Sequence, residues 1–371
     1  MARLTVELDD SQALAWRLQR HCLSRPGARS VKAAVCRVVA LRGWPMDLAE
    51  LAVAVRRSAP TPGELTAALS AGDVIRSYAF RGGSYVFTPE VGAVLLSVHT
   101  APRSWEKERF QRQAGFELAD WEPFRAAMQE ILEPEPLTRR EIADRLADIP
   151  ALRGLADAAT GSGADALYKP LHWWGDICFG PERDGQATFR RLRDDPAWPG
   201  LPDLDDAGRA AIELYLGAYG PATVANLHYW LAEGLAAPRR RVMQWLNELG
   251  DDVSEVTVGD ITGYVCTKDL DDIAAAEPSE QVRLLPGFDP WLLGPGTADT
   301  RLLAAQRRSV GTRGANLVLR GGVVSGVWRR RRDEVTVSWF DEAGLVPRDE
   351  LETEARRVVG VDVTVNSRPS E

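Results

Sequence analysis

Cysteine and histidine are scarce in this chain of 371 residues, which contains four of each. Cys22, Cys36, Cys178 and Cys266 stand far apart, fit no zinc-binding spacing and are not completed to one by the histidines. We therefore expect buried free thiols of a reducing compartment and no bound metal.

Long apolar runs are missing as well. No stretch of about 18 apolar residues occurs, so no membrane span is expected. Residues 1–10 lack the apolar centre of a signal peptide. The composition, 45% hydrophobic and 26% charged, is that of a globular protein, and the length favours two or three domains. These features predict a cytoplasmic protein.

Lysine is rare, and acidic residues outnumber basic ones, which gives a net charge of −8. Such a balance argues mildly against a nucleic-acid partner, but the charge is segregated along the chain. Residues 301–332 contain nine arginines and no acid, whereas residues 251–280 are acidic and Asp333, Glu334, Asp341 and Glu342 follow the arginines. A local basic face is enough to hold phosphates.

What the chain does contain is a recurring order of helices followed by a hairpin. Leu14, Leu18, His21 and Cys22 mark one helical face, and further helical runs are predicted over 31–41, over 48–55 with Asp47 as a plausible N-cap, and over 64–70. Two strand-like runs, 74–80 and 84–87, then flank Gly82-Gly83, which is a hairpin signal. Helices that lead into a hairpin are typical of a winged helix, in which one helix enters the major groove.

The same order returns twice and is followed by a β-rich end. The second copy has helices over 121–132, 142–146 and 167–174, a capping box from Thr138 to Glu141, and strands over 176–180 and 187–190. The third has helices over 207–219, 223–233 and 239–249 and strands over 253–258 and 261–267. Strands over 317–320, 323–328 and 334–340 and a helix over 350–359 suggest a small β-barrel or sandwich.

We therefore predict an α+β protein with three tandem winged-helix domains and a small C-terminal β-rich domain. The predicted boundaries are 1–118, 119–200, 201–280 and 281–371. No dimerisation helix is evident, so a monomer is expected.

Several cationic and aromatic residues are candidates for DNA contact. Arg42 could hold a phosphate and Trp44 could stack on a displaced base, although Trp44-Pro45 could equally be a packed loop corner. Arg76 and Arg81 lie at the base and the tip of the first hairpin and could contact the DNA backbone, or could be solvated.

Two arginine clusters are further candidates. Arg239, Arg240 and Arg241 open a helix, where cations oppose the macrodipole and phosphate could offset the cost, although tolerated surface charge is an alternative. In Arg329–Arg332, strand alternation sends Arg329 and Arg331 to one face, where they either reach a ligand or are solvated. The turn Phe288-Asp289-Pro290-Trp291 is interpreted as structural, with Asp289 bonding its own backbone.

Short segments in a specific order carry a family resemblance. They are Leu14-Ala15-Trp16-Arg17-Leu18, Ala49-Glu50-Leu51-Ala52, residues 74–82, Tyr219-Gly220-Pro221-Ala222-Thr223, residues 284–289 and residues 322–330. The chain resembles the bacterial winged helix DNA-binding domain-containing family, which includes the AlkZ-like and YcaQ-like DNA glycosylases. The resemblance implies tandem winged helices and a β domain around a DNA-holding channel. It also implies a monofunctional glycosylase mechanism for alkylated or crosslinked bases, without metal or cofactor.

The residues that would carry this chemistry depart from the family pattern. Active members have Gln-x-Gln or Gln-x-Asp before the Ala-Glu-Leu-Ala helix, where this chain has Arg42, Gly43 and Trp44. The Arg-Gly-Thr-Leu-His hairpin of the family is here Arg81-Gly82-Gly83-Ser84-Tyr85, so Tyr85 replaces a histidine. Gly82 and Tyr85 join Arg81 as candidates for DNA contact.

Three functions follow as alternatives. The first is a non-catalytic binder of duplex DNA, damaged duplex included, with nucleoid association. The second is a glycosylase that uses Asp47 as general base, where Asp47 could equally be only a helix cap. The third is a transcriptional regulator or a scaffold whose winged helices bind protein.

Overall fold

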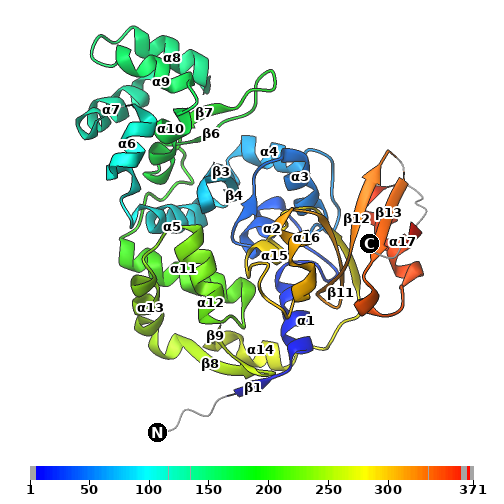
Figure 1. The fold of residues 1–371 in the computed structure, drawn as a ribbon. Coiled ribbons are helices and arrows are strands. Elements are labelled where there is room, and N and C mark those ends of the chain that lie inside the picture. Colours follow the sequence, from blue (N-terminus) through cyan, green and yellow to red (C-terminus); the bar gives the residue numbers. More distant parts are fainter. Residues whose placement is uncertain (1–5, 116, 134, 333, 361–365, 368–371) are drawn as a thin grey trace. The chain divides into compact units, whose positions relative to one another are not determined.

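The computed structural model describes residues 6–115, 117–133, 135–332, 334–360 and 366–367, so Asp333 and residues 1–5 lie outside the described residues. Helices and strands are mixed along the chain, which confirms the predicted α+β class (Figure 1). The chain divides into two units. Unit 1 comprises Met1–Leu65, Ile212–Trp230 and Leu246–Glu371, and unit 2 comprises Thr66–Ala211 and Leu231–Trp245. The four domain boundaries remain a prediction.

Unit 1 begins with helices close to those predicted. They are α1 (Asp10–Arg20), α2 (Val31–Arg37) and α3 (Met46–Ala54), with β2 (Leu41–Arg42) between the last two. The predicted end of α2 at Leu41 is wrong, because the helix stops at Arg37. Val38 is its C-cap, and Val39 has a φ of +65°, a left-handed conformation in which a helix does not continue.

The start and the buried face of α1 both follow from its sequence. The Asp9 carboxylate accepts a hydrogen bond from the Ser11 N–H at 2.7 Å, which caps the helix. Leu14 and Leu18 are four positions apart and lie on one face, in an apolar cluster that includes Trp291. α1 thus forms part of the core of unit 1.

The C-terminal part of unit 1 forms a five-stranded sheet. Its strands are adjacent in the order β10 (Val282–Leu285), β11 (Asn316–Arg320), β12 (Val323–Arg331), β13 (Glu334–Trp339) and β14 (Asn366–Ser367). Helix α17 (Arg348–Val359) packs on one face, where Leu351 and Ala355 contact a cluster that includes Trp328. This helix confirms the prediction over 350–359 to within two residues at its start.

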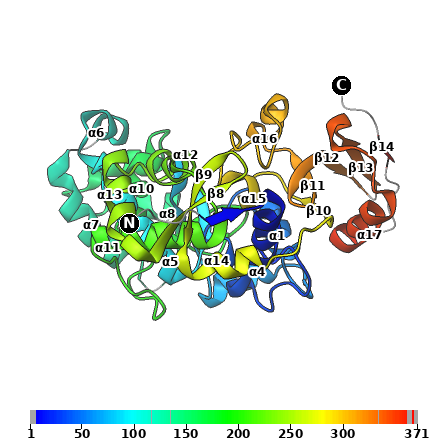
Figure 2. The ribbon, with the colours of Figure 1, turned by 90° about the horizontal axis from the view of Figure 1, so that it is seen from below.

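A three-stranded sheet holds the third predicted hairpin. β8 (Val253–Val258) and β9 (Ile261–Cys266) pair antiparallel, as expected from the sequence. β1 (Val6–Leu8) adds to β8 in parallel, with Val6 opposite Val256 (Figure 2). Sequence reasoning missed β1, because a run of three residues carries almost no periodicity.

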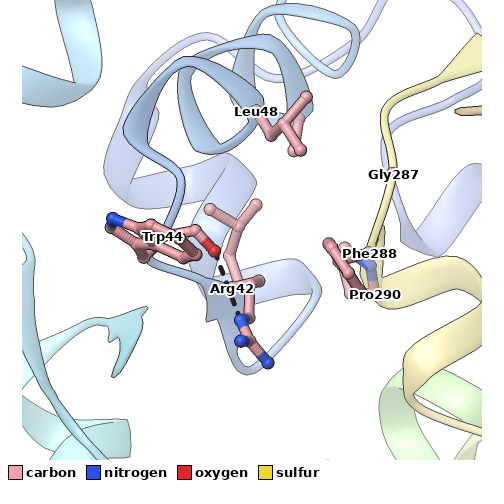
Figure 3. A pocket seen from close by; sticks show the side chains of 8 residues that line it. Arg42, Trp44, Leu48, Gly287, Phe288 and Pro290 are labelled. Carbon is pink, nitrogen blue, oxygen red and sulfur yellow. Dashed lines mark hydrogen bonds between the residues drawn. The ribbon is translucent and has the colours of Figure 1, made fainter. Parts of the chain in front are cut away.

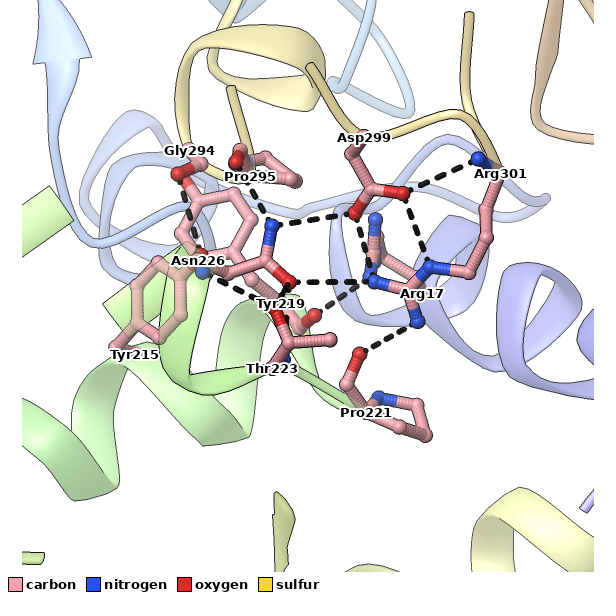
Figure 4. A network of polar contacts seen from close by, with 10 residues as sticks. All are labelled: Arg17, Tyr215, Tyr219, Pro221, Thr223, Asn226, Gly294, Pro295, Asp299 and Arg301. Atoms are coloured by element: carbon pink, nitrogen blue, oxygen red, sulfur yellow. Dashed lines mark hydrogen bonds and ion pairs between the residues drawn. The ribbon is translucent and has the colours of Figure 1, made fainter. Parts of the chain in front are cut away.

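A buried polar network joins α1 to the end of α11 (Leu204–Tyr219) and to the segment that follows α15 (Pro290–Leu293) (Figure 4). Arg17 donates to the Tyr219 carbonyl at 2.5 Å, Arg301 pairs with Asp299 at 2.7 Å, and Asn226 donates to Asp299 at 3.3 Å. Burial, followed by the charge of Arg301, lowers the pKa of Arg17 to about 10, so it remains charged at neutral pH. Arg301 is therefore engaged in this network, with 12% of its side chain exposed, and is not a free cation of the predicted basic face.

Unit 2 contains the first two predicted hairpins in one sheet. Its strands run in the order β4 (Ser84–Phe87), β3 (Ile75–Tyr78), β6 (Ile177–Phe179), β7 (Thr188–Arg191) and β5 (Leu137–Thr138). Its principal helices are α5 (Pro89–Thr100), α7 (Trp121–Ile131), α8 (Arg139–Ala147) and α10 (Ala164–Trp173). The capping box from Thr138 to Glu141 is confirmed at the start of α8. β3 and β6 pair with Arg76 opposite Phe179, and no local sequence pattern predicted this pairing of the two hairpins.

Three α-helices contribute residues to both units. They are α4 (Glu64–Ala71), α11 and α13 (Arg239–Glu248). In place of the single helix predicted over 223–233, α12 (Val224–Leu227) is followed by a π-helical stretch, His228–Gly234. None of the helices in the described ranges is long and apolar enough to cross a membrane.

The four cysteines are free, but they are not all buried. Cys178 and Cys266 are buried as predicted, and Cys22 is partly covered. Cys36 is exposed, which corrects the prediction. It lies on the outer face of α2, whereas Val31, Ala34 and Val35 form the buried face.

Candidate nucleic-acid interface

A small surface pocket in unit 1 brings together two residues that the sequence singled out. Arg42 lies between Trp44 on one side and Phe288 on the other, with Leu48 from α3 nearby (Figure 3). The pocket is shallow, with a cavity volume of about 10 Å³, which is room for about one water molecule. Trp44 is 63% exposed, so it is not the packed loop corner that was the alternative.

Arg42 contacts both sides of this pocket. Its Nε donates to the Trp44 carbonyl at 3.3 Å, across the turn that joins β2 to α3. Its guanidinium carbon lies 5.3 Å from the centre of the Phe288 ring, a cation–π distance. Sequence reasoning assigned Phe288 only a structural role, because its partner is 246 positions away in the chain (288 − 42).

The wall that carries Phe288 is fixed by a buried ion pair. The Asp289 carboxylate accepts from both terminal nitrogens of Arg56, at 2.7 and 2.8 Å, and both side chains are fully buried. Asp289 also caps α15 by accepting from the Trp291 N–H at 2.8 Å. This confirms that Asp289 bonds its own backbone. Phe288 itself has a φ of +60°, which only a well-supported turn imposes on a bulky residue.

Asp47 is not the cap of α3. The helix begins at Met46, its N-cap is Pro45, and Asp47 stands in the first turn. The capping interpretation is therefore wrong, because the Trp44-Pro45 turn starts the helix earlier than the apolar pattern suggested. Asp47 is exposed and has no hydrogen-bond or ion-pair partner among the residues that the structure describes.

The donor and acceptor inventory of the pocket limits its chemistry. Arg42 has N–H donors and no acceptor, and the Trp44 indole is a donor only. Neither side chain can accept a proton from water, whereas both can contact an anion or the face of an aromatic ring. Neither of these two side chains can therefore serve as a general base.

The tip of the β3–β4 hairpin in unit 2 is cationic. Arg81 is exposed, with a φ of +51°, and Gly82 follows with a φ of +69°. A Cβ at Gly82 would lie 3.1 Å from the Lys169 Nζ, so a lysine of α10 stands directly behind the tip. Tyr85 is buried against the Phe80 ring, with 5.0 Å between ring centres. A contact of Tyr85 with DNA stays a prediction.

Lys169 belongs to a polar cluster that sequence reasoning missed. The Asp165 carboxylate accepts hydrogen bonds from Arg139 at 2.5 Å and from the Tyr78 hydroxyl at 3.2 Å. It also forms an ion pair with Lys169 at 3.3 Å. Burial, followed by the charge of Asp165, raises the pKa of Tyr78 to about 12, so its hydroxyl keeps its proton. The i to i+4 spacing of Asp165 and Lys169 on one helix was the signal that could have indicated this pair.

Arg76 is not exposed, as a residue that contacts phosphate would have to be. Its side chain is buried, it pairs with Glu182 at 3.2 Å, and its guanidinium carbon lies 4.7 Å from the Phe179 ring centre. It would have to leave Glu182 to reach a phosphate. Its observed contacts join β3 to β6.

The three arginines at the start of α13 differ in whether they form an ion pair. Arg239 pairs with Glu233 at 3.2 Å, and Arg241 pairs with Asp205 at 3.0 Å. Arg240 is exposed and has no partner among the described residues. Arg240 is thus the member of this cluster whose charge is not offset by a neighbouring acid.

The arginines of the predicted basic face are also divided. Arg307 pairs with Glu342 at 2.9 Å, and Arg320 pairs with Glu280 at 2.7 Å, so acids distant in sequence neutralise part of the segment. Arg329 and Arg331 are exposed on the face of β12 opposite to Trp328 and α17, as alternation predicted. Neither has an ion-pair partner within the described parts of the chain.

Known proteins resemble the chain over nearly its whole length. Residues 35–360 match the family described as DNA glycosylase AlkZ-like. An interstrand DNA cross-link repair glycosylase of Streptomyces sahachiroi is 32% identical over 360 residues, which cover 94% of this chain and 95% of that protein. The solved structure of the Streptomyces sahachiroi DNA glycosylase AlkZ has a TM-score of 0.91 and 30% identity, and the match covers 97% of this chain and 100% of that one. The chain belongs to the DNA glycosylase AlkZ-like family.

Proposed function

We propose that this protein binds duplex DNA, damaged duplex included, without releasing a base. The proposal rests on the two residues that stand at the family's motif positions. Arg42 and Trp44 stand there in one open pocket and supply a cation and an exposed aromatic face. Both are groups that hold nucleic acid, and neither can activate water for hydrolysis.

The contacts with the DNA backbone come from the remaining cations. Arg240, Arg329 and Arg331 are exposed and form no ion pair within the described residues, although Glu334 faces Arg331 across β12 and β13. Arg81 and Gly82 form a hairpin tip that can follow a phosphate backbone as a wing does. We assign these residues to phosphate contacts, which position a protein on DNA without reading its sequence.

The arrangement that we propose for binding is three winged-helix modules and a C-terminal β-rich domain around a DNA-holding channel. Support comes from the hairpins β3–β4, β6–β7 and β8–β9, each of which follows a group of helices. The protein acts as a cytoplasmic, nucleoid-associated monomer in this account.

A second candidate function rests on Asp47. Its carboxylate is exposed and unpartnered among the described residues, so it is available as a general base. It would take a proton from water as the water oxygen bonds to the anomeric carbon. The glycosidic C–N bond would break, and the base would leave with its electron pair. The name of the Streptomyces sahachiroi relative, a cross-link repair glycosylase, favours this alternative.

Fluorescence anisotropy tests the binding proposal. A labelled duplex of about 25 base pairs is titrated with the protein at several salt concentrations. Because phosphate contacts release counterions, we expect log K to fall linearly with log salt concentration. Absence of binding, or an affinity that does not change with salt, would favour a scaffold that binds protein. Base release that is lost in Asp47→Asn would favour the glycosylase.

A further inference from the structure

The short helix α16 (Arg308–Thr312) carries a cationic surface on unit 1. The helix projects beyond α15 and β11, as Figure 2 shows. Its exposed residues, together with its C-cap, form what we call the α16 patch: Arg308, Ser309, Thr312 and Arg313. The Thr312 hydroxyl donates to the Ser309 carbonyl at 3.0 Å. The two guanidinium groups and the Ser309 hydroxyl are therefore the donors that the patch offers to a ligand.

Gly311 determines which side of α16 is buried. A Cβ at this position would lie 2.7 Å from the Leu292 side chain and 3.3 Å from that of Leu303, so only glycine lets the helix approach this part of the core so closely. Ser309 and Arg313 are each two positions from Gly311, a rotation of about 200° around the helix. Both side chains therefore point away from the core.

Both ends of α16 are held by contacts with other parts of unit 1. Before the helix, Arg307 pairs with Glu342 at 2.9 Å, and its guanidinium carbon lies 4.4 Å from the centre of the Phe340 ring. After the helix, a Cβ at Gly314 would lie 2.2 Å from the Phe288 ring, so the backbone packs directly against this ring. The patch thus lies on a supported segment, which reduces the entropy that a ligand contact costs.

The arginines of the patch differ from their neighbours in having no counterion. Arg307 and Arg320 belong to the same acid-free segment and pair with acids distant in sequence. The side chains of Arg308 and Arg313 form no ion pair within the described parts of the chain. Five residues of helix separate them by about 7.5 Å along its axis. Two like charges therefore stand near each other, and an anion that contacts both would offset their repulsion.

The chemistry and spacing of these donors match a phosphate backbone. A guanidinium group binds phosphate oxygens through parallel N–H donors, and a serine hydroxyl can add a third hydrogen bond. The separation of the two arginines is comparable with that of successive phosphates in one strand of DNA.

We propose that the α16 patch binds two neighbouring phosphates of one DNA strand. Arg308 contacts one phosphate and Arg313 the next, and the Ser309 hydroxyl donates to either. This inference rests on the proposed DNA binding and assigns a phosphate site beside the Phe288 turn. Such contacts position the duplex and do not read its sequence.

Two variants of equal net charge test the proposal. Arg308→Gln/Arg313→Gln removes the charges of the patch, and Arg307→Gln/Arg320→Gln removes two arginines of the same segment that are already paired with acids. Duplex affinity is measured by anisotropy between about 50 and about 200 mM salt. Urea unfolding of each variant shows that its fold is retained.

Each phosphate contact contributes about 0.9 to the slope of log K against log salt concentration. Arg308→Gln/Arg313→Gln should therefore reduce the slope by about 1.8, so that over this salt range the wild-type protein loses about twelvefold more affinity than the variant. Arg307→Gln/Arg320→Gln should reduce the slope by less than half as much. Arg308→Lys/Arg313→Lys keeps both charges and should retain the wild-type slope.

The results separate this inference from the proposed function. If the wild-type protein binds, an unchanged slope in Arg308→Gln/Arg313→Gln, or equal reductions in the two glutamine variants, would overturn the phosphate site alone. Absence of salt-dependent duplex binding by the wild-type protein would overturn the proposed function itself.

Discussion

The guanidinium of Arg56 donates two hydrogen bonds, of 2.7 and 2.8 Å, to the carboxylate of Asp289, and both side chains are fully buried. Arg56 follows α3, and Asp289 follows Phe288. The pair therefore ties together the two segments that line the pocket. Arg56 also donates to the Ala52 carbonyl at 2.8 Å, which fixes the guanidinium against the end of the helix.

Asp289→Asn should destabilise unit 1 strongly. It leaves the buried Arg56 charge without its counterion, a change that costs about 3–5 kcal/mol. The free energy of unfolding in urea measures the effect. Glu280→Gln serves as control, because it breaks the exposed pair with Arg320 and should cost less than about 1 kcal/mol. Equal losses in the two variants would show that Asp289 does not hold the pocket wall.

Trp44→Ala should weaken duplex binding and leave stability unchanged. The indole is 63% exposed, so its removal leaves no cavity, whereas a base stacked on it contributes about 1–3 kcal/mol. Anisotropy titration and urea unfolding are carried out on the same preparation. Leu345→Ala is the matched control, because it removes an apolar side chain that is 89% exposed and lies outside the pocket. A loss of stability equal to the loss of binding would indicate a structural role.

The two faces of β12 should differ in their contribution to DNA binding. If Arg329 and Arg331 contact two phosphates, Arg329→Gln/Arg331→Gln should reduce the slope of log K against log salt by about 1.8. Arg330→Gln/Arg332→Gln removes the same charge, but Arg330 already donates to the Arg332 carbonyl at 2.8 Å. This control should have a smaller effect. Equal slopes in the two variants would mean that the arginines act only through net charge.

Acid should destabilise unit 2 through His99. Burial lowers the pKa of His99 to about 4, and its Nδ1 lies 2.7 Å from the Leu235 carbonyl oxygen. In the unfolded chain His99 binds a proton as the pH falls below 6.5, whereas in the folded chain it does so only below about 4. The free energy of unfolding thus has its full value above pH 6.5 and falls by about 3 kcal/mol as the pH decreases to 4.

His99→Asn tests this assignment, because asparagine can still donate to Leu235 and does not titrate. The urea midpoint of the variant should depend less on pH between 6.5 and 4 than that of the wild-type protein. An unchanged dependence would assign the acid sensitivity to other groups. His172 is one of these, since burial lowers its pKa to about 3.

Local features were predictable from the sequence because their determinants are local. The β3–β4 hairpin follows from two β-prone runs around Gly82-Gly83, and the start of α8 follows from the Thr138 capping box. The boundaries failed where a turn overrode the apolar pattern. Pro45 starts α3 before Asp47, and the left-handed Val39 follows the early end of α2.

The pocket itself could be predicted only in part. Arg42 and Trp44 are close in sequence, so the family motif identified them together. Phe288 joins them through tertiary structure alone, and no periodicity connects residues so far apart. Arg76 illustrates the reverse case. Its burial depends on Phe179 and Glu182, which a reading of the hairpin alone cannot include.

A single-turnover glycosylase assay tests the central claim most directly. Duplexes carrying an N7-alkylguanine, an uncharged alkylated base or an interstrand crosslink are incubated with protein at a concentration that saturates binding. Abasic sites are then cleaved with alkali, and wild type is compared with Asp47→Asn. We predict saturated binding with no strand breaks above the protein-free control. Strand breaks that appear with the wild-type protein and vanish in Asp47→Asn would contradict the account and establish a glycosylase with an altered active site.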